Sequence, residues 1–488
     1  MSPNNLVQKY RESSVTFKAT IWYTVCNMLQ KIAAFLIIPF LTRMLSTSDY
    51  GLYSVFLSWV DIIEILATMR IYSNGYVAGL VKNSDDQEKY TCSIQFISII
   101  TTAICFGIFL LFSNQISGLI NIEKTFVYYM FFSFFATSSV GIWSSRQRVN
   151  NKYKLMVLVT LLYSVLAPIA SIIGAYVSTD RLATVIEVRV MAQFIIAVPF
   201  FLMNLVGKNK AVIWKYCREA LSYNIPLIPY YLSMVLLNSS DRIMIKSIVG
   251  ETEAGIYSVA YSLSMAIFVF VGALNLSLQP WMFNKLKNNN PDGASKVISI
   301  ATCFIALLNM CVLIVSPELI KIVASEKYAE AIWTMPPIIC SLLIIFIYQQ
   351  LLNIHFFFGE TKIVFIASII AASLNLALNY VFIHMIGYIA AGYTTLASYL
   401  VIMILYYITM KGITHRKNID YRNYFNLPLM FGVVCAFVCL AVLVALLYPY
   451  PLVRYIIVIV ACTLLIIFRR RIIAFISKTG LIKGMIKT

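Results

Sequence analysis

The 488-residue chain has little charge: Asp, Glu, Lys and Arg make up 12% of it, and only three residues are histidine. An average soluble domain has about 25% charged residues, so the ordinary soluble class is excluded. The histidines lie far apart without H-E-x-x-H spacing, and neither a G-x-S-x-G elbow nor a nucleotide-binding P-loop occurs. We therefore expect neither an enzyme nor a cofactor.

Cysteine pairs with metal-binding spacing are also absent. The ten cysteines lie in apolar segments, no C-x-x-C motif occurs, and no histidine cluster lies beside them. Small, apolar packing residues explain such cysteines. We expect no disulfide and no metal site.

Long apolar segments are abundant. Hydrophobic residues make up 60% of the chain, and the mean hydropathy is +0.83. The apolar runs are about 20 residues long, the length with which a helix crosses a bilayer core of about 30 Å. These features predict an all-α integral membrane protein with about 14 transmembrane helices. They are expected near residues 20–42, 50–72, 91–112, 125–144, 155–177, 183–205, 225–248, 255–281, 297–316, 331–354, 363–385, 388–411, 427–448 and 452–469.

Basic residues outnumber acidic ones, 38 to 20, and they gather in alternate loops. Lys and Arg collect on the cytoplasmic side of membrane proteins, so this pattern predicts that both termini are cytoplasmic. The richest inner segments are 146–154, 208–218 and the tail from Arg469 to Thr488, which we expect along the inner membrane surface. The excess is spread over short loops, which argues against nucleic acid as a partner and for membrane lipids.

An internal repeat indicates two lobes. The segment from Ser48 to Val55 recurs as Thr252 to Val259, an offset of 204 residues, and both copies contain G-x-Y-S-V. An even number of spans separates the copies, so they enter the membrane in the same direction and are related by a pseudo-two-fold axis along the membrane normal. We expect lobes at 1–206 and 207–412, followed by an additional helix pair and basic tail at 413–488.

Ionisable residues inside the spans are the candidate functional residues, because charge in lipid is costly and marks a pathway. Lys31 and Asp61 lie about eleven residues into antiparallel helices, which places both near the bilayer centre. Glu64 shares a helix face with Asp61. A cation beside an acid that carries a proton or binds a cation is one interpretation. A static pair that locks the two helices is the other.

Two further sites contain arginine. Arg70 lies near the inner end of the second span, where it either faces a cavity or extends to the cytoplasmic surface. Asp241 and Arg242 are neighbours in the seventh span and therefore point to different sides of it. The planar guanidinium of Arg242 suits phosphate oxygens, and extension to the outer surface is the alternative.

Polar amides in the later spans include Asn375 and Asn379 on one helix face. Hydrogen bonds between helices explain such residues, and binding of sugar hydroxyls is the functional alternative.

The chain resembles the bacterial polysaccharide flippases, the Wzx-type O-antigen and capsule transporters of the MOP superfamily. The resemblance extends over essentially the whole chain and is carried by short, loose motifs. These are Asn27 to Lys31, Pro39 to Arg43, Ser46, Asp49 to Tyr53, Asp241-Arg242, Gly255 to Ser258, Asn375 to Asn379, Gly387 and Gly392. Lys31 and Arg242 match the cationic cavity residues of the family. Many members have twelve spans, and lipid II flippases have fourteen, as expected here.

The resemblance implies alternating access and outward flipping of undecaprenyl-diphosphate-linked oligosaccharide across the bacterial cytoplasmic membrane. We expect Lys31, Arg70, Arg242, Asn375 and Asn379 to bind substrate. We expect Asp61, Glu64 and Asp241 to couple transport to protons or sodium. A glycan polymerase and other assembly proteins are expected partners. The alternatives are a MATE-type multidrug or cation antiporter and a membrane glycan polymerase, which would normally carry a larger outer loop.

Overall fold

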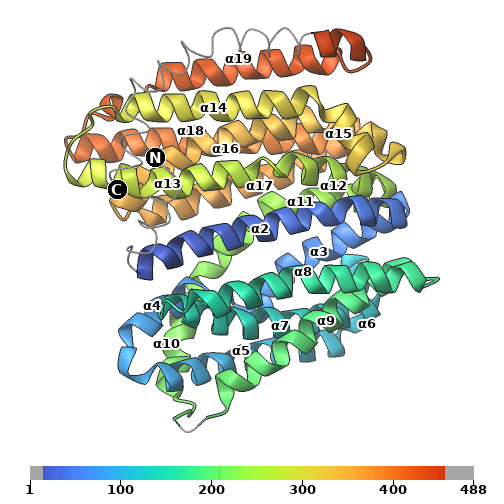
Figure 1. Cartoon of the computed structure of the whole chain (residues 1–488), viewed down its shortest axis with the longest axis vertical. Helices are drawn as coiled ribbons and strands as arrows, with labels where there is room; N and C mark the ends of the chain where they lie inside the picture. The colour runs from blue at the N-terminus through green and yellow to red at the C-terminus, as the bar shows by residue number, and fades with distance from the viewer. Residues whose placement is uncertain (1–14, 208, 457–488) are drawn as a thin grey trace, which may run out of the picture. The chain divides into compact units, whose positions relative to one another are not determined.

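The described part of the chain is helical throughout. The computed structural model describes residues 15–207 and 209–456, and no strand occurs among them (Figure 1). The helices of the first half are α2 (Val15–Met44), α3 (Thr47–Thr68), α4 (Asn74–Lys82), η1 (Ser84–Asp86), α5 (Gln87–Leu111), α6 (Ser113–Ile120), α7 (Lys124–Val149), α8 (Tyr153–Val177), α9 (Arg181–Leu205), α10 (Trp214–Asn224), η2 (Ile225–Leu227) and α11 (Ile228–Ile248). Those of the second half are α12 (Glu251–Met265), α13 (Phe268–Lys287), α14 (Ala294–Ile314), α15 (Ser316–Val323), η3 (Glu326–Trp333), α16 (Met335–Phe357), α17 (Thr361–Ile386), α18 (Ala390–Arg416), η4 (Tyr421–Asn423) and α19 (Leu427–Leu446).

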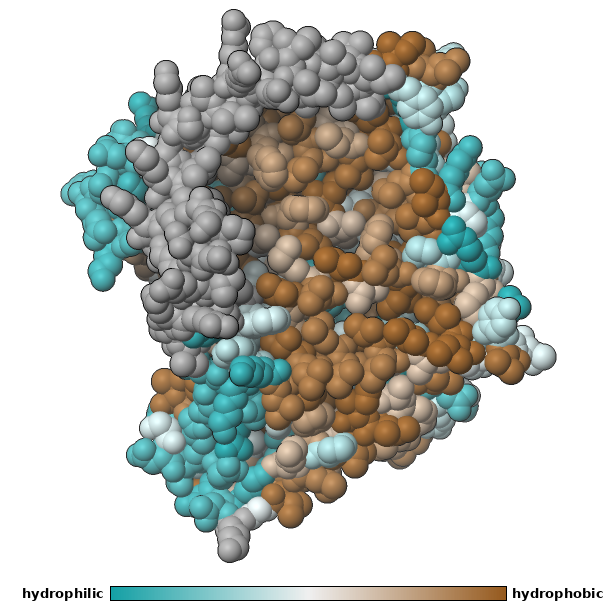
Figure 2. Space-filling view, in the orientation of Figure 1, coloured by the Kyte–Doolittle hydropathy of each residue, from teal (hydrophilic) through white to brown (hydrophobic). Residues whose placement is uncertain are grey.

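Among these residues, 13 helices are long and apolar enough to cross a membrane. They correspond to the first 13 spans expected from hydropathy, which confirms the all-α integral membrane class. Most of the expected last span, 452–469, and the basic tail from Arg469 lie outside the described residues. On the face that Figure 2 shows, apolar residues cover the middle of the helices and hydrophilic residues gather at their ends.

Some boundaries differ from the sequence prediction. The second span was expected to continue to residue 72, but α3 ends at Thr68 because Met69 and Arg70 have φ values of 50° and 43°. A left-handed backbone cannot continue a right-handed helix. Arg70 therefore lies in the turn after α3. The eighth span divides into α12 and α13, and the short helices α4, α6, α10 and α15 between the spans were not predicted.

The described part of the chain forms two compact units, which are divided between residues 255 and 256. In the first unit, α3 packs against α11 and α5, α9 against α7 and α8, and α2 against α8. In the second, α18 packs against α16 and α17, and α14 against α16 and α19. The lobes inferred from the repeat, 1–206 and 207–412 with the helix pair of 413–488, stay a prediction.

Both copies of the repeat begin a helix at the equivalent residue, α3 at Thr47 and α12 at Glu251. They also contact each other through their glycines. A Cβ atom on Gly51 would lie 1.9 Å from the carbonyl oxygen of Glu251, and one on Gly255 would lie 2.1 Å from that of Thr47. Each glycine thus meets the first residue of the other helix, so the contact is reciprocal. Only glycine permits this approach.

Candidate functional site

The centre of the candidate site is Asp61 on α3. Asp61 is exposed, whereas Glu64 on the same helix is buried. Asp61 interacts electrostatically with Arg242, Arg70 and Arg189, and it accepts a hydrogen bond from Ser239. The arginines come from α11, from the turn after α3 and from α9. The fold therefore gathers charges that are far apart in the sequence around one accessible carboxylate.

Arg242 reaches this site because α11 packs along α3. Its neighbour Asp241 is buried, with 1% of its surface exposed, whereas Arg242 is partly exposed. The two side chains therefore occupy different environments, as adjacent positions on one helix require. Arg242 contributes to the site through its action on Asp61, and Asp241 is enclosed within the helices.

The turn after α3 brings Arg70 back toward Glu64. Its Nη2 atom lies 3.9 Å from Oε2 of Glu64, and its guanidinium lies 5.6 Å from the ring centre of Tyr231. The hydroxyl of Tyr72 donates to Oε1 of Glu64 at 2.5 Å. Through these contacts the side chain of Arg70 turns back toward α3, and only 28% of it is exposed. Arg70 therefore belongs to the site.

Arg189 on α9 was missing from the predicted site. Its guanidinium donates to the hydroxyl of Tyr53, and it lies 5.8 Å from the centre of that ring. Tyr53 belongs to the first copy of the repeat. A charge inside the expected span 183–205 was the available signal, but proximity to the outer end of that span made a surface position the simpler interpretation.

Lys31 occupies a different environment from the arginines. It is exposed on α2, next to Gln30, whose amide donates to the hydroxyl of Ser164 on α8 at 2.9 Å. Cys26 on the same helix is buried beside Val157 of α8, to whose carbonyl it donates at 3.9 Å. The side of α2 that bears Cys26 and Gln30 therefore packs on α8, and Lys31 remains accessible.

Asn375 and Asn379 lie in the second unit and are fully buried. The Asn375 amide donates to the hydroxyl of Thr395 at 3.3 Å, and the Asn379 amide donates to Oδ1 of Asn375 at 3.2 Å. Thr394 in turn donates to Oδ1 of Asn379. These bonds join α17 to α18. These contacts are of the kind that helix packing requires, and sugar binding by the two residues stays a prediction.

The described site has three arginines, at positions 70, 189 and 242, and two carboxylates, Asp61 and Glu64. The excess is one positive charge, to which accessible Lys31 adds another on α2. No group of three or more metal-binding side chains occurs among the described residues. Forked guanidinium groups beside an exposed carboxylate suit an anion with several oxygens, such as a phosphate.

Comparison with known proteins supports a transporter fold. The sequence profile of the family described as "Polysaccharide biosynthesis protein" matches residues 16–286, and that of the MatE family matches 226–381. A curated relative, Lsg locus putative protein 1 from Haemophilus influenzae, is 23% identical over 414 residues, which is 81% of this chain and 98% of the relative.

Two solved structures share the fold. The lipid II flippase MurJ in an inward closed conformation has a TM-score of 0.66 and 14% identity, covering 93% of this chain and all of that one. An inward-facing multidrug resistance MATE family transporter of the MOP superfamily has a TM-score of 0.66 and 12% identity, covering 82% and 99%. At these identities, the likeness concerns the fold.

Proposed function

Because the chain belongs to the polysaccharide biosynthesis protein family of MOP-superfamily transporters, we propose that it flips undecaprenyl-diphosphate-linked oligosaccharide repeat units across the bacterial cytoplasmic membrane. The observation that carries the proposal is the excess of guanidinium groups around Asp61. Charge of this sign inside membrane spans requires an anionic partner, and a diphosphate provides one. The 13 spans support a multi-pass membrane protein, and we place both termini in the cytoplasm.

In this proposal, the arginines bind the diphosphate, and Asp61 competes with the diphosphate for their guanidinium groups. Without substrate, the carboxylate of Asp61 balances part of the charge of Arg189 and Arg242. A diphosphate forms stronger, multidentate hydrogen bonds with the same guanidinium groups and displaces the carboxylate. A carboxylate within a membrane span that loses its counter-ions takes up a proton or a sodium ion. Substrate binding is thereby coupled to ion binding at Asp61, with Glu64 and Asp241 as further acidic groups.

The decisive test is translocation in vesicles that contain the purified protein and a fluorescent lipid-linked oligosaccharide. We expect Arg189→Gln and Arg242→Gln to slow translocation at least tenfold, and Lys31→Gln and Arg70→Gln to slow it less. Arg218→Gln, which removes an exposed arginine from α10, is the matched control. Equal rates in the wild type and both arginine variants would remove these residues from the mechanism.

Export of organic cations is the second candidate, supported by the MatE match and the MATE structure. The charge of the site opposes it, because three arginines repel a cationic substrate. Deletion strains separate these functions from that of a glycan polymerase. Single lipid-linked repeat units on the inner face of the membrane support the flippase, whereas units on the outer face support a polymerase. Unchanged glycan with increased drug sensitivity supports the exporter.

A further inference from the structure

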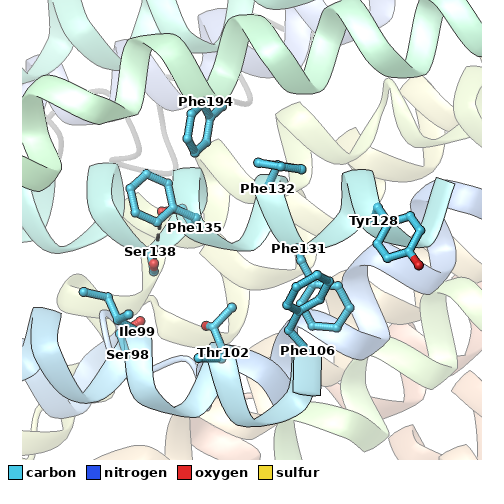
Figure 3. A pocket seen from close by; sticks show the side chains of 11 residues that line it. Ser98, Ile99, Thr102, Phe106, Tyr128, Phe131, Phe132, Phe135, Ser138 and Phe194 are labelled. Carbon is cyan, nitrogen blue, oxygen red and sulfur yellow. Dashed lines mark hydrogen bonds between the residues drawn. The ribbon is translucent and has the colours of Figure 1, made fainter. Parts of the chain in front are cut away.

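Apart from the charged site, the first unit contains a pocket lined by α5, α7 and α9 and built mostly of aromatic rings (Figure 3). Its volume is about 240 Å³. The ring centres of Phe132 and Phe194 lie 5.3 Å apart with an edge-to-face orientation, and those of Phe106 and Phe131 lie 4.9 Å apart. Such contacts hold rings in place. The rings form a preorganised apolar wall.

Two polar side chains of the lining bind to backbone carbonyls, and the buried hydroxyl of a third, Ser98, has no hydrogen-bond partner among the described residues. Thr102 donates its hydroxyl to the carbonyl of Ala67 at 3.3 Å, and Ser138 donates to that of Phe135 at 3.1 Å. No charged residue lines the pocket. An engineered cavity of about 150 Å³ holds benzene, and sites for drug-sized ligands begin near 300 Å³. The pocket therefore fits a short apolar segment, such as part of a hydrocarbon chain.

The position of the pocket along the membrane spans indicates where its ligand enters. Ser98, Ser138 and Phe194 lie near the middle of α5, α7 and α9, and all three helices are membrane spans. Phe132 is 40% exposed, and Ala103 is exposed as well, so the lining reaches the surface. Hydrocarbon surrounds the middle of a span. The ligand is therefore the chain of a lipid, which enters from the bilayer.

The pocket and the charged site are built on some of the same helices. Helix α9 carries both Arg189 and Phe194, and the Thr102 hydroxyl binds the backbone of α3, the helix of Asp61. We propose that this pocket binds a segment of the polyprenyl chain of the lipid-linked substrate, an inference that rests on the proposed function. Methyl branches and double bonds restrict a prenyl chain, so docking costs it less entropy than a saturated acyl chain. The first unit thus holds both the diphosphate and the chain.

Photolabelling tests the inference without requiring transport. A diazirine-bearing polyprenyl phosphate without sugar is added to vesicles containing the protein, and labelled peptides are mapped by mass spectrometry. We expect labelling on α5, α7 and α9. Ala103→Trp fills the pocket from an exposed position and should reduce this labelling at least tenfold. Ile104→Trp is the control, because Ile104 is 57% exposed on the same helix and does not line the pocket.

Competition identifies the lipid. Excess unlabelled undecaprenyl phosphate should abolish the labelling, and phosphatidylglycerol at the same concentration should leave it unchanged. Equal competition by phosphatidylglycerol, or equal labelling of Ala103→Trp and the wild type, would overturn the inference. A protein that binds the probe here but moves no lipid-linked glycan retains the prenyl site and loses the proposed function, so the two failures are distinguishable.

Discussion

At the scale of single residues, the role of the Asp61 carboxylate depends on which charged side chains lie near it. Its position within α3 is evident from the sequence, but its counter-ions are not. Lys31 was the partner that antiparallel spans suggested, whereas in the structure Asp61 interacts electrostatically with Arg70, Arg189 and Arg242. A carboxylate among three guanidinium groups competes with any anionic ligand for them. In the function proposed here, that competition separates binding from release.

Asp61→Asn removes this competitor and keeps the shape of the side chain. We expect polyprenyl diphosphate to bind several-fold more tightly, by about 1 kcal/mol, because the arginines lose a nearby negative charge. We also expect translocation to fall at least tenfold, because the variant lacks the carboxylate to which we assign ion binding. Titration of the purified variant with a fluorescent polyprenyl diphosphate measures the affinity. Asp85→Asn at an exposed position in η1 is the control, and weaker binding by Asp61→Asn would contradict the competition.

The ion pair of Glu318 on α15 with Arg454 should make the stability of the protein depend on pH. Burial opposes its ionisation, but hydrogen bonds from Arg454, at 2.8 and 2.9 Å, and from Tyr455, at 2.8 Å, hold the pKa of Glu318 below its usual value. The stabilisation is complete above the unfolded pKa of about 4.3 and is lost as the pH falls through the lower folded pKa. Glu318→Gln should cost about 1 kcal/mol at pH 7.

Thermal unfolding in detergent measures this cost. The difference between Glu318→Gln and the wild type should be full at pH 7 and should disappear in strong acid, below the folded pKa of Glu318. Glu326→Gln, at an exposed residue of η3, is the control. A difference that persists unchanged in strong acid would assign the effect to packing.

At the scale of secondary structure, the two copies of the repeat contact each other where α3 and α12 begin. Ser46 caps α3, because its hydroxyl accepts from the Asp49 amide at 3.0 Å while Asp49 accepts from the Ser46 amide at 3.4 Å. Ser48 in the first copy donates to Glu251 at 2.9 Å, and Lys246 lies 3.6 Å from the same carboxylate. The glycine contact and these polar contacts hold the beginnings of α3 and α12 together.

Gly51→Ala and Gly255→Ala test this crossing. A methyl group at either position would overlap a carbonyl oxygen, so the helices must separate. Overpacking of this kind costs about 1–3 kcal/mol or more, and we expect both variants to unfold at lower temperature and to transport more slowly. Gly107→Ala and Gly412→Ala are matched controls, because no atom lies within 4 Å of the added Cβ. Wild-type stability of both crossing variants would exclude a tight contact.

At the scale of the whole molecule, the charge distribution predicts the orientation in the membrane. Basic segments such as 146–154 and 208–218 follow alternate spans, and the same rule places residues 288–293 inside and residues 324–334 outside. The attraction between the basic loops and anionic lipid headgroups at the inner face depends on this orientation. The outward direction of flipping that we propose depends on it as well.

Cysteine labelling checks the orientation directly. In a background whose ten native cysteines are replaced by serine, we expect an impermeant maleimide to label Glu326→Cys in intact cells and to label Asn290→Cys only after lysis. Both positions are exposed, so accessibility of the side chain itself is matched. The reverse pattern would invert the topology and the direction of transport proposed here.

The amino-acid sequence alone determined the membrane class, the number and approximate limits of the described spans, and the repeat, because these depend on local hydropathy and on spacing along the chain. It also located Asp61, Glu64, Arg70 and Arg242 as charges that need partners. The tertiary structure decided which groups lie near them, added Arg189, and showed that Asn375 and Asn379 take part in hydrogen bonds between α17 and α18. Contacts between distant helices depend on rotation and packing, which no local pattern specifies.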